Sequence, residues 1–489
     1  MLNTPIVLYL GSRGLSAAGN LLAVAIFTRM AGRADYGHYL LIFAWSLIVY
    51  GFTTHWMRFA FFGVYQSRRG DEYVASLGLL ITVALAVIAG GFAVMALSGL
   101  LDPVFLLAML SLICGMTICE AACEVIKTRL DAKSVALAMV LRTCLTVGFG
   151  SLVLWLGYGA TGLAFAIALA HLIAAVPCLR GLIRIRLSQA SRAAALKMLT
   201  YGWPLLLSFG VMAVGQTIDR LLLAHYSGAA ALGPYGAVAD LLRQSFAVVG
   251  EAITLSLVAS AKQSANEGNF AACNDALRTA FNACLAAAAF GAAFFIVFGD
   301  ALVWVLLGSE FHEHARGLIF IFAVAFAFMT MRNYYFAQVI YFCHASYLEL
   351  IISLLFVAIS GVLAILLLPA YGAIGAALGL MAGYAAACIA FMVAGRRYYR
   401  MPVDLAAVGE IPMLAILFVL ASQAIGGVVA SVNLAMILQA LLFVALGALV
   451  VHRFGLLRNA GSERAPAVGG GESADEQVSA ASQITSACV

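Results

Sequence analysis

The chain has 489 residues, of which 64% are hydrophobic and only 10% are charged. A soluble domain carries about 25% charged residues, so this composition excludes a water-soluble globular protein. The net charge of +5 does not indicate nucleic-acid binding, because the basic residues lie in short loops between apolar runs, where they orient a membrane protein. The runs reach about 20 residues, enough to cross a bilayer as a helix. We therefore expect an all-α, polytopic membrane protein.

About fourteen transmembrane helices are expected in chain order. The apolar runs predict them near residues 6–29, 37–64, 75–99, 104–127, 134–156, 160–180, 201–225, 235–260, 277–299, 315–342, 346–368, 372–394, 408–429 and 433–453. The first is predicted to be a retained helix, because no basic segment and cleavage site mark it as a signal peptide. Residues 455–489 are rich in Gly, Ser, Ala and Glu without an apolar period, which predicts a disordered tail.

The distribution of basic residues predicts the orientation. With the N-terminus inside, most of the 27 Lys and Arg residues fall in cytoplasmic segments, and only Arg29, Arg33 and Arg316 fall in the opposite loops. Cytoplasmic loops carry such an excess of positive charge. We therefore expect a bacterial inner-membrane protein whose two termini are both cytoplasmic.

The two halves of the chain repeat a set of landmarks. The first half has Pro5, Gly11, Tyr36, Gly37 and Gly51, and the second has Pro204, Gly210, Tyr235, Gly236 and Gly250 at a constant offset. Six helices per copy place both copies in the membrane in the same sense, as in transporters with parallel repeats. We predict two six-helix lobes, residues 1–197 and 198–400, related by a pseudo-twofold axis along the membrane normal. An extra helix pair, 401–454, follows. The alternative is two fused bundles with no cavity between them.

Charged residues inside the predicted helices give the candidate site. An arginine at the bilayer centre costs about 2.5–3.5 kcal/mol, so such residues should face a polar cavity or an opposite charge. The predicted binding residues for a diphosphate are Arg13, Arg142, Arg243 and Arg332, with Arg58 nearer a helix end. Candidates for ion pairing or coupling are Glu120, Asp219, Arg220 and Asp240. Arginine binds phosphate through planar, often bidentate hydrogen bonds. In the alternative interpretation, each arginine pairs with a neighbouring acid: Glu120 with Arg13 or Arg142, and Asp240 with Arg243.

Histidine and cysteine residues add no metal site. His171 is expected to bond a neighbour or, less simply, to relay protons. His312 and His314 flank Glu313 in a short outer loop, where no further ligands are evident. The ten cysteines have no metal-site spacing and are expected to pack as small apolar residues. Because no Gly-rich phosphate loop is present, we expect neither ATP hydrolysis nor a cofactor.

Several short segments, in order and spacing, resemble a known family. They are TRMAGRADYGHY at 28–39, YGWP at 201–204, IDR at 218–220, LGPYG at 232–236 and YGAIGAA at 371–377. They resemble bacterial polysaccharide (O-antigen or exopolysaccharide) flippases of the multidrug/oligosaccharidyl-lipid/polysaccharide exporter superfamily. The resemblance implies two six-helix lobes around a cationic cavity, alternating access, and an undecaprenyl-diphosphate-linked oligosaccharide as cargo. In relatives that move the peptidoglycan precursor, two extra C-terminal helices help to form a groove for the lipid tail.

We therefore expect a flippase rather than an enzyme, with lipid-linked oligosaccharide and membrane lipid as partners, and with polysaccharide polymerase and export proteins as further candidates. A cation-coupled multidrug antiporter is the first alternative, although deep arginines outnumber deep acids. A membrane-embedded polymerase or ligase is the second, although it would need larger outer loops or a carboxylate cluster.

Overall fold

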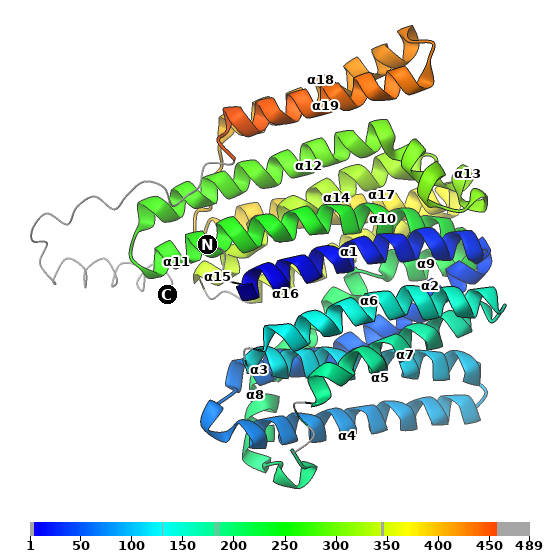
Figure 1. Cartoon of the computed structure of the whole chain (residues 1–489), viewed down its shortest axis with the longest axis vertical. Coiled ribbons are helices and arrows are strands. Elements are labelled where there is room, and N and C mark those ends of the chain that lie inside the picture. The colour runs from blue at the N-terminus through cyan, green and yellow to red at the C-terminus, as the bar shows by residue number, and fades with distance from the viewer. Residues whose placement is uncertain (1–3, 130, 181, 183–184, 344–346, 457–489) are drawn as a thin grey trace, which may run out of the picture. The chain divides into compact units, whose positions relative to one another are not determined.

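The computed structural model describes residues 4–129, 131–180, 182, 185–343 and 347–456. These residues form helices joined by short turns, and no strand occurs among them (Figure 1). Thirteen helices in the described ranges are long and apolar enough to cross a membrane. Helix α1 (Thr4–Met30) precedes them. The all-α, multi-pass prediction is therefore confirmed, while the predicted tail lies largely outside the described residues.

The helices follow the predicted order, with three differences in detail. The second predicted span is one continuous rod made of α2 (Arg33–Tyr50), a π-helical segment η1 (Gly51–His55) and α3 (Trp56–Val64). The seventh breaks at Gln216 and Thr217 into α8 (Arg192–Gly215) and α9 (Ile218–Ser227). The eighth is longer than predicted, because α10 (Ala229–Ile253), η4 (Thr254–Val258) and α11 (Ala259–Asn266) form one rod.

The other helices are simpler. The first half adds η2 (Ser67–Arg69), α4 (Gly70–Leu97), α5 (Pro103–Thr128), α6 (Ala132–Trp155), α7 (Gly159–Arg180) and η3 (Leu187–Gln189). The second half adds α12 (Phe270–Leu306), η5 (Ser309–Phe311), α13 (His312–Ala315), α14 (Leu318–Tyr334), η6 (Phe336–Val339), α15 (Ile340–Cys343), α16 (Tyr347–Tyr371), α17 (Ala373–Gly395), α18 (Leu405–Val428) and α19 (Val432–Arg453).

Contacts divide the described residues into two compact units. The first takes those within Met1–Gln244, Asp300–Ile319 and Phe356–Leu380, and the second takes those within Ser245–Gly299, Phe320–Leu355 and Met381–Val489. In the first unit, α1, α6, α7 and α5 pack side by side in that order (Figure 1). The lobe boundaries at residues 197 and 400 stay a prediction.

Glycines bring α2 against the start of α10 inside the first unit. A Cβ atom placed on Gly37 would lie 1.8 Å from the carbonyl oxygen of Ala229, and one on Gly233 would lie 2.2 Å from that of Arg33. Only glycine permits such an approach of two backbones. The crossing brings the face of α2 that carries its tyrosines next to the polar residues of α10.

The second unit holds the extra helix pair. The Asp404 carboxylate accepts hydrogen bonds from the backbone N–H of Ala406 and Ala407 at the start of α18, and from Arg278 Nε of α12 at 2.9 Å. The bond from Arg278 holds the pKa of the Asp404 carboxyl below its usual value. Phe443 of α19 packs against Phe418 of α18, with ring centroids 5.3 Å apart. Figure 1 shows α18 and α19 running alongside α12.

Candidate functional site

A polar cavity of about 370 Å³ lies in the first unit among α1, α2, η1, α5, α6, α7 and α10. Polar or charged side chains on its wall are Asn20, Tyr36, Tyr39, Tyr50, His55, Glu120, Arg142, Thr143, Thr146, His171, Asp240, Arg243 and Gln244. Most of these belong to helices that are apolar enough to cross a membrane. Ionisable residues within such helices mark substrate or ion pathways, so this cavity is the candidate site.

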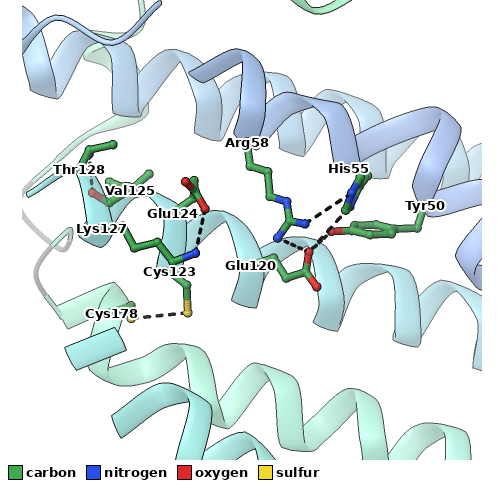
Figure 2. A network of polar contacts seen from close by, with 10 residues as sticks. All are labelled: Tyr50, His55, Arg58, Glu120, Cys123, Glu124, Val125, Lys127, Thr128 and Cys178. Atoms are coloured by element: carbon green, nitrogen blue, oxygen red, sulfur yellow. Dashed lines mark hydrogen bonds and ion pairs between the residues drawn. The ribbon is translucent and has the colours of Figure 1, made fainter. Parts of the chain in front are cut away.

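One end of the cavity is organised around Glu120 of α5. Figure 2 shows Tyr50, His55 and Arg58 converging on its carboxylate. Arg58 Nη1 lies 2.6 Å from Glu120 Oε2, the Tyr50 hydroxyl donates to the same oxygen, and His55 Nδ1 lies 3.8 Å away. The π-helical segment η1 separates Tyr50 from Arg58, and such segments often occur at functional sites. Glu120 therefore pairs with Arg58, an arrangement that spacing along the sequence did not single out.

Asp240 of α10 organises a second cluster. It accepts two hydrogen bonds from Arg220, at 2.6 and 3.2 Å, and a third from Arg243 at 2.8 Å. Asp219, beside Arg220 in α9, accepts the Tyr235 hydroxyl at 2.6 Å. The Arg220 side chain is 6% exposed, whereas that of Arg243 is 33% exposed and reaches the cavity. Arg220 thus holds the wall together, and Arg243 can also contact a ligand.

Arg142 of α6 differs from these arginines. It lies on the cavity wall, half-buried, and within the part of the chain that the structure describes it makes no hydrogen bond and no ion pair. Nearby, His171 Nδ1 donates to the carbonyl oxygen of Ile167 at 2.8 Å when the ring is neutral, which leaves Nε2 as an acceptor. Of the charged side chains described at the Glu120 end, Arg58 and Arg142 are cationic and Glu120 is anionic. This end therefore carries an uncompensated positive charge.

Two predicted arginines are placed differently. Arg332 lies in the second unit, where its guanidinium lies 2.6 Å from Glu349 Oε1 and 3.2 Å from Ser353 Oγ. It also lies over the Phe391 ring, 5.1 Å from the centroid, and it does not line the cavity. The Arg13 side chain lies outside the described residues.

Residues of the outer loop and the helix interiors take ordinary roles. His314 Nε2 lies 2.7 Å from Arg33 Nη1. No group of three or more His, Cys, Asp or Glu residues suited to a metal ion occurs among the described residues. The Cys123 and Cys178 sulfurs are 3.8 Å apart where α5 packs on α7 (Figure 2).

The uncharged part of the wall was not predicted. Tyr36, Tyr39, Phe43 and Tyr50 line the cavity from one face of α2. Their spacing of three, four and seven residues places them on one side of a helix. That spacing was visible in the sequence, but charge alone was used to choose site residues.

Comparisons with known proteins agree with this architecture. The sequence model of a polysaccharide biosynthesis protein family matches residues 73–316. No curated protein matches the sequence. Among solved structures, the lipid II flippase MurJ in an inward closed conformation has a TM-score of 0.77 at 12% identity, covering 92% of this chain and 100% of MurJ. An inward-facing multidrug resistance MATE transporter has a TM-score of 0.63 at 14% identity, covering 80% and 97%. A transporter of the same superfamily from Pyrococcus furiosus gives 0.53 at 17%, covering 80% and 93%.

An all-helical, multi-pass fold with a polar cavity among its apolar helices defines a membrane transporter rather than an enzyme. The matched family and the shared fold narrow this class further. The chain belongs to the polysaccharide flippase family of the multidrug/oligosaccharidyl-lipid/polysaccharide exporter superfamily, as its sequence motifs predicted.

Proposed function

We propose that this protein moves an undecaprenyl-diphosphate-linked oligosaccharide from the cytoplasmic to the periplasmic leaflet of a bacterial inner membrane by alternating access. The product would supply cell-surface or exported polysaccharide synthesis. One observation carries the proposal: Arg142 lies on the wall of a cavity among membrane-spanning helices with no anionic partner among the described residues. An arginine there is costly unless water or an anionic ligand compensates it.

The diphosphate is the anion that fits this position. A guanidinium group offers parallel N–H donors to phosphate oxygens, and the cavity's apolar surroundings strengthen the attraction. Arg142 would bind one phosphate, and Arg58 would become a second donor if the diphosphate displaced Glu120. The prenyl chain can remain in lipid, while water and the polar wall solvate the sugars.

The state of the cavity acids disfavours a cation antiporter. Glu120 lies 2.6 Å from Arg58, and Asp240 lies within hydrogen-bond distance of both Arg220 and Arg243. A cationic drug would therefore have to displace guanidinium groups to reach either carboxylate. An anion meets no such competition at Arg142.

Deletion of the gene, followed by extraction of membrane lipids, tests the proposal. We expect polyprenyl-diphosphate oligosaccharide to accumulate and surface polysaccharide to fall. The wild-type protein and the Arg316→Gln control, which changes an exposed loop residue, should both restore export, whereas Arg142→Gln should not. Unchanged lipids together with heightened sensitivity to cationic dyes would refute the proposal and favour the antiporter.

A further inference from the structure

An aromatic face of α2 forms part of the cavity wall. Tyr36, Tyr39, Phe43 and Tyr50 all line the cavity. The Tyr39 and Phe43 rings have centroids 6.2 Å apart and planes inclined at 40°. They are tilted rather than stacked, so neither ring covers the face of the other. Both are half-buried, which leaves part of each ring accessible from the cavity.

Polar groups on the same wall lack protein partners. Tyr36 is only 2% exposed, and neither its hydroxyl nor that of Tyr39 makes a hydrogen bond to any residue that the structure describes. The Asn20 and Gln244 side chains also line the cavity without such a bond among the described residues. Leaving a buried polar group without a partner costs free energy. These four groups therefore need a partner that enters the cavity, either water or a ligand.

Aromatic rings combined with hydroxyl and amide groups suit a sugar ring. A pyranose has a flat patch of C–H bonds, which an aromatic face can cover, and a rim of hydroxyls that both donate and accept hydrogen bonds. Tyrosine offers an apolar ring together with a polar handle, and the amides of Asn20 and Gln244 donate and accept. A purely lipidic ligand would leave all of these polar groups unsatisfied.

The aromatic face lies beside the proposed diphosphate position. Tyr50 bonds Glu120 at one end of the cavity, and Phe43 precedes Tyr50 by two helical turns. A helix rises about 1.5 Å per residue, so Phe43 lies roughly 10 Å further along α2. A diphosphate held at Arg142 would therefore direct its attached sugar along α2 toward Phe43 and Tyr39. The cavity volume of about 370 Å³ is near the lower end for a small-molecule site, which suits one or two sugar rings rather than a whole oligosaccharide.

We propose that Tyr39 and Phe43, with the hydroxyls and amides around them, form a subsite for the sugar that is attached directly to the diphosphate. The subsite makes the protein prefer a glycosylated lipid diphosphate over the bare one. This inference rests on the proposed function but can fail independently of it, because the diphosphate and the sugar contact different residues.

Binding of two matched probes to the purified full-length protein separates these contacts. The bare probe is farnesyl diphosphate, and the sugar probes are its glucosyl, galactosyl and N-acetylglucosaminyl forms. For the wild-type protein, at least one sugar probe should bind about tenfold more tightly than the bare probe. Tyr39→Leu combined with Phe43→Leu should abolish that preference and leave affinity for the bare probe unchanged. Tyr39→Phe keeps the ring and should reduce the preference only partly.

Controls keep the outcomes distinct. Phe62→Leu changes an exposed ring outside the cavity and should bind all probes as the wild type does. Unaltered binding of the bare probe shows that the double variant is folded. If that variant kept the full preference, or if the wild type bound bare and sugar probes equally, the sugar subsite would be refuted while the diphosphate site stood. If Arg142→Gln bound farnesyl diphosphate as tightly as the wild type, the proposed function itself would fail.

Discussion

Removing the Asp240 carboxylate should destabilise the cavity wall by a predictable amount. Asp240→Asn eliminates the anion that binds both Arg220 and Arg243. Because the Arg220 side chain is 6% exposed and that of Arg243 is 33% exposed, Arg220 bears most of the cost. Breaking a buried ion pair by removing one partner costs about 3–5 kcal/mol. We expect the lower end, because Asp219 beside Arg220 supplies a second carboxylate.

Equilibrium unfolding in detergent micelles titrated with SDS measures this loss. Arg220→Gln combined with Asp240→Asn should cost less than the sum of the single changes, with a coupling free energy of about 1–3 kcal/mol. The matched control is the exposed pair of Arg453 and Glu410, whose side chains are 64% and 37% exposed. Neutralising that pair should change stability by less than about 1 kcal/mol. Full additivity of the Arg220 and Asp240 changes would refute the shared-carboxylate arrangement.

Three further changes test other parts of the structure. Glu120→Gln frees the guanidinium that Glu120 now holds, so affinity for farnesyl diphosphate should rise several-fold in a direct binding assay; unchanged or weaker binding would contradict this. Gly37→Ala should cost about 1–3 kcal/mol or more by the same unfolding assay, because its Cβ would meet a carbonyl oxygen, whereas Gly90→Ala, with open space around it, should be neutral. The depressed pKa of Asp404 means that its bond to Arg278 contributes stability above the ordinary carboxyl pKa of about 4, and that this contribution disappears as the pH falls below it. Asp404→Asn should flatten that acid limb of the stability profile, and an unaltered limb would refute the assignment.

The fold could be read from the sequence because lipid imposes one simple rule. Backbone groups in hydrocarbon must be paired within each segment, so every long apolar run predicts a helix. The same rule does not predict internal irregularities. The π-helical segment at Gly51–His55 and the break at Gln216 and Thr217 keep the chain apolar and helical on average. No change in composition marks either one.

Charge identified much of the cavity but not the pairing within it. Arg58, Glu120, Arg142, Asp240 and Arg243 were all chosen because charge is costly in a membrane. Which of these residues meet depends on how α2, α5 and α10 cross, and a close approach such as that of Gly37 to Ala229 is a tertiary property. Sequence spacing could suggest Asp240 with Arg243, which share one helix, but not Glu120 with Arg58.

Transport by the purified protein tests the central claim most directly. Liposomes would contain a glycosyl polyprenyl diphosphate with a fluorophore on its sugar, and dithionite added outside would quench only the outer leaflet. We predict that the wild-type protein and Arg316→Gln make the inner-leaflet probe accessible, and that Arg142→Gln slows this about tenfold or more. A fluorophore-labelled phosphatidylcholine should remain protected in all cases. Equal rates for Arg142→Gln and the wild type would contradict the assignment of a phosphate-binding cavity around Arg142.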